Sequence, residues 1–241
     1  MYASCKHTGS AISLSGNVYV LTIYIGDPDF SQENKVKFWN ALRTAEDWLK
    51  AQAKKYGKVI NFSNGFFGSE QTVIVDNIVI GSGSGKEPVD ILEPILSKIG
   101  YKTTSQFYEW AVRDRGNDSC LVLIVADKEG RSYSIPYVKG CNTKYFTECC
   151  MMYTQYAGRT IWAASIAHEM LHCFGAWDLY QNYLVSEAQA DAAARLYPDD
   201  IMRRISPDIG DLNIGALTAW GVGLSDSFSR DFELFGLKKG R

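Results

Sequence analysis

The chain has 241 residues, of which 46% are hydrophobic and 22% are charged, a balance typical of a folded globular protein. Its 25 basic and 27 acidic residues give a formal net charge of -2 without a long run of one sign, so composition gives no reason to expect nucleic acid or an anionic membrane as a partner. No apolar run reaches the roughly 18 residues of a membrane span, and Met1–Gly16 lacks the apolar core of a signal peptide. Localisation and oligomeric state stay open.

The first elements along the chain are predicted to be a buried strand and a long helix. Asn17–Ile25 is apolar on both alternating faces, which is typical of a central strand that is covered on both sides. Ser31 is a suitable N-cap for the helix that follows, and Gly57 supplies its stop. Between them, apolar residues recur at helical spacing: Phe38, Leu42, Ala45, Leu49 and Ala53.

The middle of the chain alternates between strand-like and helix-like segments. Strands are predicted at three apolar stretches bounded by turn signals: Val59–Phe67, Thr72–Ile80 and Cys120–Ala126. Helices are predicted at Val89–Ile99 and Ser105–Arg115. After a turn-rich stretch, Cys149–Tyr156 predicts a last, more polar strand, which we expect at the edge of the sheet.

Six cysteines are too few to form a disulfide scaffold for a chain of this length. Cys120 lies in an apolar strand and Cys173 in an apolar helix, so both are expected to be buried, inert thiols. Outside the cytoplasm, two bridges could join the other four: Cys5, Cys141, Cys149 and Cys150. The cysteines therefore leave the compartment open.

The helix predicted at Arg159–Phe174 is apolar nearly all round, so its polar side chains are costly to bury. Those side chains are His168, Glu169 and His172, which form the pattern H-E-x-x-H. Residues four apart lie on one helical face, so both imidazoles can bind a single metal ion while Glu169 lies beside the ion's water. The pattern predicts that His168 and His172 are metal ligands and that Glu169 is the catalytic base.

The motif continues to Gly175 and Asp178, giving H-E-x-x-H-x-x-G-x-x-D. This pattern resembles the metzincin zinc metallopeptidases, in which a glycine ends the helix and lets a third ligand turn back to the zinc. Asp178 stands where a third histidine is usual, as in metzincins of the snapalysin type. Gly175 is suited to that turn because it lacks a Cβ. The resemblance implies a Zn2+ ion held by His168, His172 and Asp178, with a peptide or protein as substrate.

Two later segments extend the resemblance. Asp199–Met202 resembles the Met-turn that passes beneath the metal, with Met202 as its methionine. Leu217–Trp220 resembles the closing C-terminal helix. Several metzincins have a tyrosine two residues after the methionine, where this chain has Arg204, and that departure argues against an auxiliary tyrosine ligand there.

The expected fold is α/β (α+β): a twisted, mostly parallel sheet with two long helices and a small, loop-rich C-terminal part. We expect one metallopeptidase catalytic domain over residues 1–241, with an N-terminal subdomain at about 17–175, a C-terminal one at about 176–241, and the cleft between them. Cys149–Tyr156 is expected to line the cleft and to pair with an extended peptide. The expected function is zinc-dependent endopeptidase activity, in which Glu169 deprotonates the water that attacks the peptide bond.

Two other interpretations stay open. Ser186–Asp191 resembles the helix that carries a glutamate ligand in thermolysin-like peptidases (gluzincins), which would make Glu187 the third ligand in place of Asp178. In a different class, the chain would be a zinc-stabilised binding domain without turnover. Chelator-sensitive cleavage of casein separates an enzyme from a binding domain.

Overall fold

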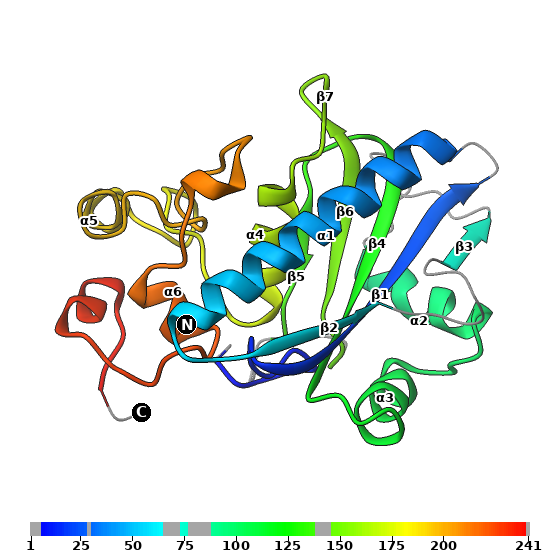
Figure 1. Cartoon of the computed structure of the whole chain (residues 1–241), viewed down its shortest axis with the longest axis horizontal. Helices are drawn as coiled ribbons and strands as arrows, with labels where there is room; N and C mark the ends of the chain where they lie inside the picture. Colours follow the sequence, from blue (N-terminus) through cyan, green and yellow to red (C-terminus); the bar gives the residue numbers. More distant parts are fainter. Residues whose placement is uncertain (1–5, 28–29, 65–72, 77–87, 138–145, 240–241) are drawn as a thin grey trace.

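Strand β1 (Gly16–Asp27) lies inside a mostly parallel sheet, as its two apolar faces predict (Figure 1). The computed structural model describes residues 6–27, 30–64, 73–76, 88–137 and 146–239. Across these residues the strand order is β2-β1-β4-β6-β5, with β3 also paired to β1 and β7 to β6. The expected α/β fold class is confirmed.

Parallel pairing joins β1 to its neighbours and continues through β4 to β6. The parallel strands are β2 (Ile60–Asn64), β3 (Val73–Asp76), β4 (Ser119–Glu129) and β6 (Cys149–Tyr156). Two short strands run antiparallel to β6, namely β5 (Tyr133–Ile135) and β7 (Arg159–Thr160). The side of β6 that faces away from β4 is therefore occupied by β5 and β7.

Helices cover both faces of the sheet because the central strands are apolar on both. One hydrophobic cluster joins one face of β1, β4 and β6 to α1 (Gln32–Lys55) and α4 (Ala163–Cys173). A second cluster joins the other face to the helical segments α2 (Pro88–Lys98), α3 (Thr104–Tyr108) and the π-helical turn Glu109–Asp114. The result is a three-layered structure with α1 and α4 on the same side (Figure 1).

Helix α1 forms as its sequence predicts. The Ser31 hydroxyl caps it by accepting a hydrogen bond from the Asn34 amide. Gly57, just after its C-terminus, has a φ of 70°, a left-handed conformation that glycine adopts without strain. The five apolar residues expected on its inner face are all fully buried: Phe38, Leu42, Ala45, Leu49 and Ala53.

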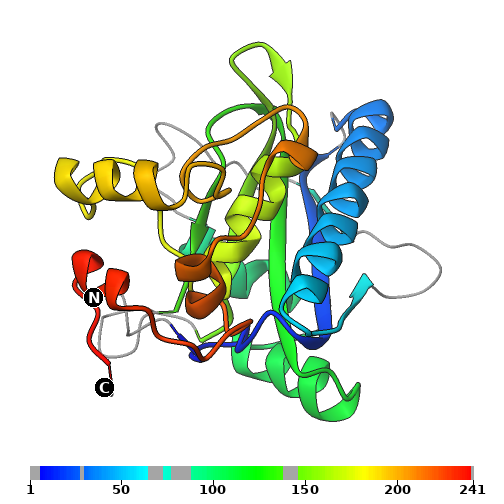
Figure 2. The ribbon, with the colours of Figure 1, turned by 60° about the vertical axis from the view of Figure 1, so that its left-hand side comes forward.

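The C-terminal part begins after α4 and packs against it (Figure 2). Its elements are α5 (Glu187–Leu196), α6 (Ala216–Gly221) and the 3-10 turns Ile209–Asp211 and Arg230–Phe235. Helix α6 matches the helix predicted at Leu217–Trp220. None of the helices in the described ranges is long and apolar enough to cross a membrane.

The structure corrects the predicted edge strand. β6 was expected at the edge because of its polar residues, but it lies between β4 and β5, and Cys149–Met152 is buried throughout. The outer strand on this side is β5, three residues within the stretch that the sequence indicated to be turn-rich. Three residues are too few for a period-two pattern to stand out, so this segment carries no clear strand signal.

The predicted helix Arg159–Phe174 also begins later than expected. Ala157 and Gly158 both have positive φ values, 50° and 70°, which form the two-residue turn of a hairpin. The chain therefore returns along β6 as β7, with Tyr156 opposite Arg159, before α4 starts at Ala163. Pairing with β6 competes with helix formation for Arg159 and Thr160.

The described cysteines are free, buried thiols. Cys120 and Cys173 are buried as predicted, but Cys149 and Cys150 are also free and buried, so neither forms one of the two bridges considered. Cys5 and Cys141 lie outside the described residues. The Sγ atoms of Cys150 and Cys173 are 3.4 Å apart, which is a hydrogen-bonding contact between β6 and α4.

Glu46 on α1 gives the fold a predictable pH dependence. Burial raises the pKa of Glu46 to about 7, although the Asn64 amide donates to both carboxylate oxygens at 2.9 Å. The folded chain therefore keeps a proton that the unfolded chain has lost above its ordinary pKa of 4.5, and the free energy of unfolding falls as pH rises through this window.

We expect the free energy of unfolding of the parent protein to fall by up to about 3 kcal/mol between about pH 5 and pH 8. The Glu46→Gln variant should not show this loss, because its amide does not ionise. Urea unfolding of both proteins at the two pH values measures the difference. If both proteins show the same pH dependence, Glu46 is not the group responsible.

Candidate metal centre

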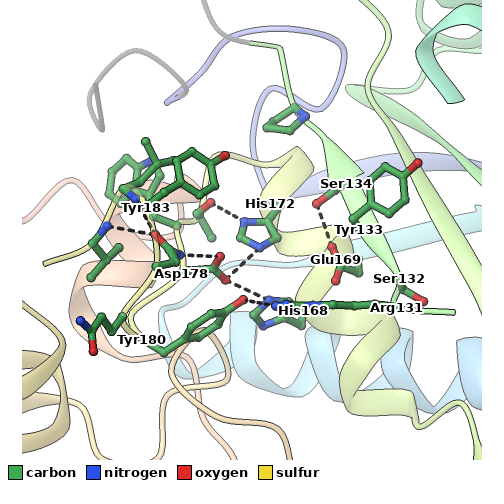
Figure 3. Close-up of a pocket in the computed structure, with 17 residues that line it drawn as sticks. Arg131, Ser132, Tyr133, Ser134, His168, Glu169, His172, Asp178, Tyr180 and Tyr183 are labelled. Carbon is green, nitrogen blue, oxygen red and sulfur yellow. Dashed lines mark hydrogen bonds and ion pairs between the residues drawn. The ribbon is translucent and has the colours of Figure 1, made fainter. Parts of the chain in front are cut away.

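Helix α4 presents the three polar side chains of the H-E-x-x-H pattern to a pocket (Figure 3). His168 and His172 lie one turn apart, with their ring centroids 4.8 Å apart and the ring planes nearly perpendicular. His168 is buried, whereas Glu169 and His172 are partly exposed to the pocket. The remaining surface of α4 is held in the core by apolar residues such as Ile166, Met170 and Leu171.

Gly175 reverses the chain directly after α4. Its φ is 102°, a conformation that residues with a Cβ rarely adopt. The Gly175 amide donates to the His172 carbonyl, and the Ala176 amide donates to the Leu171 carbonyl, both at 3.0 Å. These two bonds form a Schellman motif, which satisfies carbonyls left open at the helix end. The predicted turn at Gly175 is confirmed.

The reversal brings Asp178 back to the two histidines. One Asp178 oxygen, Oδ1, lies 3.2 Å from Nε2 of His168 and 3.3 Å from Nε2 of His172. The three candidate ligand atoms lie within 4.8 Å of one another. Ligand atoms at about 2.0–2.1 Å from a tetrahedral zinc ion lie about 3.3 Å from one another. The two distances from Asp178 Oδ1 to the histidine Nε2 atoms match this separation.

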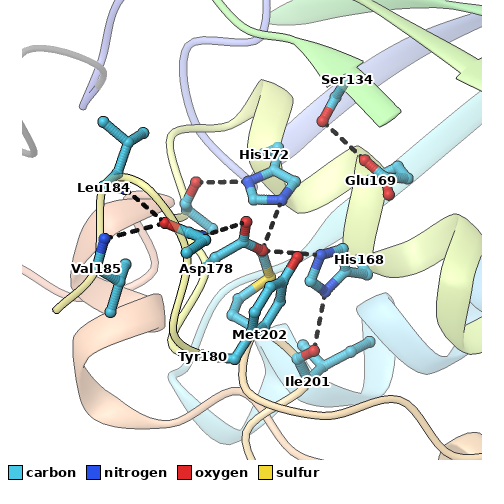
Figure 4. Close-up of polar contacts among 12 residues, drawn as sticks. Ser134, His168, Glu169, His172, Asp178, Tyr180, Leu184, Val185, Ile201 and Met202 are labelled. Carbon is cyan, nitrogen blue, oxygen red and sulfur yellow. Dashed lines mark hydrogen bonds and ion pairs between the residues drawn. The ribbon is translucent and has the colours of Figure 1, made fainter. Parts of the chain in front are cut away.

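Hydrogen bonds to the backbone fix the tautomer of both histidines (Figure 4). Nδ1 of His168 lies 2.9 Å from the Ile201 carbonyl, and Nδ1 of His172 lies 2.9 Å from the Ala176 carbonyl. A carbonyl can only accept, so each Nδ1 carries the proton and each neutral ring leaves a lone pair on Nε2. Two Nε2 lone pairs then face Asp178 Oδ1, a buried oxygen that has no hydrogen-bond donor among the described residues. Three converging lone pairs repel one another unless a cation lies between them, so the residues fit a metal ion.

The charges of the group also favour a cation. Burial lowers the pKa of His172, but the contact with the Asp178 carboxylate and the charge of Glu169 outweigh it and raise that pKa. Burial raises the pKa of Asp178, but the contacts with His168 and His172 outweigh it and hold that pKa below its ordinary value. Positive charge beside the Asp178 carboxylate, from a proton or a metal ion, is therefore stabilised.

Asn182 fixes the second oxygen of Asp178. Its amide donates to Asp178 Oδ2 at 3.1 Å, while its own side-chain oxygen accepts hydrogen bonds from the Leu184 and Val185 amides. The loop after Asp178 thus folds around Asn182 and orients the carboxylate. Asn182 could not be singled out from the sequence, since an asparagine in a loop carries no specific signal.

The segment with Met202 supports the group from the other side (Figure 4). The Ile201 carbonyl holds His168, and the Met202 carbonyl accepts the Leu179 amide at 2.8 Å. Asp200 holds this segment in place by accepting the Met202 amide at 2.7 Å and the Gly215 amide at 2.8 Å. Met202 is buried, and Figure 4 shows its side chain beside Asp178 and His168.

The pocket has a volume of about 620 Å³ and lies between β5 and the chain after α4 (Figure 3). From β5, the Ser134 hydroxyl donates to Glu169 Oε2 at 2.9 Å. Across the pocket, Tyr180 stacks beside His168 and accepts a hydrogen bond from Arg131 at 3.0 Å. Ser134, Tyr180 and Arg131 were not identified from the sequence, because only the fold brings them to the motif.

The other residues singled out from the sequence lie elsewhere. Glu187 is exposed at the start of α5 and is neither a pocket residue nor a member of the His168, His172 and Asp178 group. Arg204 pairs with Asp199 at 2.9 Å rather than facing the pocket.

The chain was compared with known protein families, curated proteins and solved structures. The sequence matches no protein-family profile and no curated protein. Among solved structures, one similar to this chain is metalloproteinase-II from Bacteroides fragilis, with 13% identity and a TM-score of 0.40 over 89% of this chain. The match covers 55% of that protein, so this chain spans little more than half its length.

Replacement of Asp178 separates the two candidate third ligands. We expect Asp178→Ala to weaken metal binding by more than about 100-fold, since even hydrogen-bond partners of metal ligands contribute about 10- to 100-fold. Glu187→Ala, the matched control, should bind metal as the parent does. Competition with a chromophoric chelator measures affinity, and circular dichroism checks the fold. Loss of metal from Glu187→Ala but not from Asp178→Ala would support the thermolysin-like arrangement instead.

Proposed function

We propose that the protein is a zinc-dependent endopeptidase of the metzincin type, with His168, His172 and Asp178 as zinc ligands. The observation that carries this proposal is the convergence of two Nε2 lone pairs and one carboxylate oxygen beside Glu169, in an open pocket. Two imidazoles and a carboxylate form a ligand set that suits zinc and leaves a position for water. The metzincin pattern in the sequence supports the same assignment.

Glu169 is the general base in this proposal. Zinc, when bound, would lower the pKa of a water molecule toward about 7 and polarise the carbonyl of the scissile bond. Glu169 lies next to His168 on the pocket face of α4, where it accepts the proton from the attacking water and returns it to the leaving amine. Ser134 holds Glu169 Oε2, and no other described residue donates to Oε1, which can take part in this transfer.

Tyr180 is placed to stabilise negative charge on the substrate oxygen. Burial, together with the neighbouring Asp178 carboxylate, raises the pKa of Tyr180 to about 12, so its hydroxyl stays protonated at neutral pH. Its oxygen already accepts from Arg131, and that bond strengthens the hydroxyl as a donor. A donor in this position stabilises the oxyanion that forms when water adds to the peptide carbonyl.

The substrate in this proposal is an extended peptide that pairs with β5. β5 is the last strand in the sheet order of the described residues, and Ser132, Tyr133 and Ser134 line the pocket. An outer strand offers unpaired backbone donors and acceptors to a further strand. The sequence predicted that β6 pairs with the peptide, and the present proposal assigns this pairing to β5 instead.

Two observations weigh against the alternatives. Glu187 is exposed and outside the pocket, so a thermolysin-like centre would need α5 to move. A purely structural zinc site has four protein ligands and is closed. The present group contains three and opens into a pocket that also contains a carboxylate base.

Glu169→Gln should retain one zinc ion per chain but lose casein cleavage by about 10²–10⁴-fold, because an amide cannot accept the proton. Elemental analysis and a quenched-peptide assay, with and without chelator, measure the two quantities. Near-normal cleavage by this variant would remove Glu169 from the mechanism. A parent protein that binds zinc but never cleaves would instead favour the binding-domain interpretation.

Tyr180→Phe should lower kcat by about 10²-fold and change KM little, since the lost bond forms only as charge develops on the substrate. Tyr183→Phe is the matched control, because Tyr183 lies at the same pocket and is 93% exposed. Steady-state kinetics on one peptide compares the two variants. Equal kcat values for Tyr180→Phe and the parent would show that this hydroxyl has no catalytic role.

A further inference from the structure

The charges lining the pocket are unevenly distributed. Arg131 is the sole lysine or arginine among the described residues that line it. Glu169 and Asp178 bring two negative charges, which the proposed divalent zinc ion would balance. Arg131 then leaves an excess of positive charge in the loaded pocket, and such an excess attracts an anionic group.

The Arg131 guanidinium has unused hydrogen-bonding capacity. Nη2 donates to Tyr180 Oη at 3.0 Å, and no acidic side chain in the described ranges forms an ion pair with it. Arginine has five N–H donors in a planar fork, so at least one edge remains available for both oxygens of a carboxylate. Figure 3 shows the side chain extending toward Tyr180.

The hydrogen bond to Tyr180 also determines where the unused N–H donors of Arg131 lie in the pocket. Arg131 precedes β5, the strand proposed to pair with the substrate, and its partner Tyr180 is stacked beside His168. A group held by Arg131 is therefore close to the candidate catalytic residues. The alternative role, a purely structural link across the pocket, uses one donor of five and leaves the charge without an acidic partner among the described residues.

We propose that Arg131 forms a carboxylate-binding subsite, which selects peptides that carry an acidic group within a few residues of the scissile bond. This inference rests on the proposed function. The carboxylate comes from either an aspartate or glutamate side chain or the free C-terminus of a peptide. Both present two oxygens that match the guanidinium fork.

Binding to the zinc-loaded Glu169→Gln variant tests the subsite without turnover. One set of fluorescein-labelled, C-terminally amidated peptides places Asp, Asn or Lys at each position of a neutral sequence. A second set compares the neutral peptide as free acid and amide. Fluorescence anisotropy measures the dissociation constant of each peptide. We expect the peptide with Asp at one position to bind about tenfold more tightly than the peptide with Asn there, or the free-acid peptide to bind about tenfold more tightly than its amide. The set that shows the preference identifies the source of the carboxylate.

Substitutions of Arg131 in the same background link the preference to this side chain. Arg131→Gln should reduce the ratio of the affinities for acidic and neutral peptides to about one. Arg131→Lys should retain part of this preference, because an ammonium group keeps the charge but cannot bind both carboxylate oxygens as the planar guanidinium does. Arg113→Gln, which removes an equally charged side chain that is 73% exposed and outside the pocket, should keep the full preference.

Equal binding of acidic and neutral peptides in both sets would overturn the subsite, as would a preference that survives Arg131→Gln. Casein cleavage by the parent protein, with and without chelator, is measured separately. Chelator-sensitive cleavage without an Arg131-dependent preference for acidic peptides would contradict the subsite but leave the proposed peptidase function intact. A preference without any cleavage supports the subsite and contradicts the proposed peptidase function.

Discussion

Two hydrogen bonds from imidazole to backbone decide what the pocket can do. Because Nδ1 of His168 and Nδ1 of His172 each face a carbonyl oxygen, both rings direct an Nε2 lone pair at the Asp178 carboxylate. Without these bonds, an Nε2–H could donate to Asp178 and the group would be a satisfied polar cluster. With them, the group lacks positive charge at its centre, which is the physical basis for proposing a metal ion there.

The fold supplies these two carbonyls from different segments. The Ala176 carbonyl comes from the reversal at Gly175, and the Ile201 carbonyl comes from a segment that Asp200 anchors through the Met202 and Gly215 amides. α4 itself is held against the sheet and beside α1 by the larger hydrophobic cluster. The candidate centre is thus held on a buried helix, while the residues proposed to meet the substrate come from β5 and the loop after Asp178. This division is consistent with a rigid centre beside a variable binding surface.

Local patterns predicted much of this arrangement. The spacing of His168, Glu169 and His172 on one helix and the glycine at 175 indicated which side chains meet, because both features act within a few residues. The partners of those side chains were not predictable, since Ser134 lies 35 residues before Glu169 and Arg131 lies 49 residues before Tyr180 in the sequence. The same limit explains the edge strand: β5 is too short to show alternation, and its place depends on pairing with β6. Long-range contacts of this kind leave no periodic signal.

The tautomers and ligation of the histidines test the central claim most directly, and the chain has only three histidines to observe. Long-range 1H–15N NMR of the imidazoles, recorded before and after one equivalent of zinc, distinguishes protonated, lone-pair and metal-bound nitrogens. The account predicts that His168 and His172 keep a protonated Nδ1 and bind zinc through Nε2, with His7 unchanged. Spectra in which zinc leaves both rings unaltered, or binds through Nδ1, would contradict it.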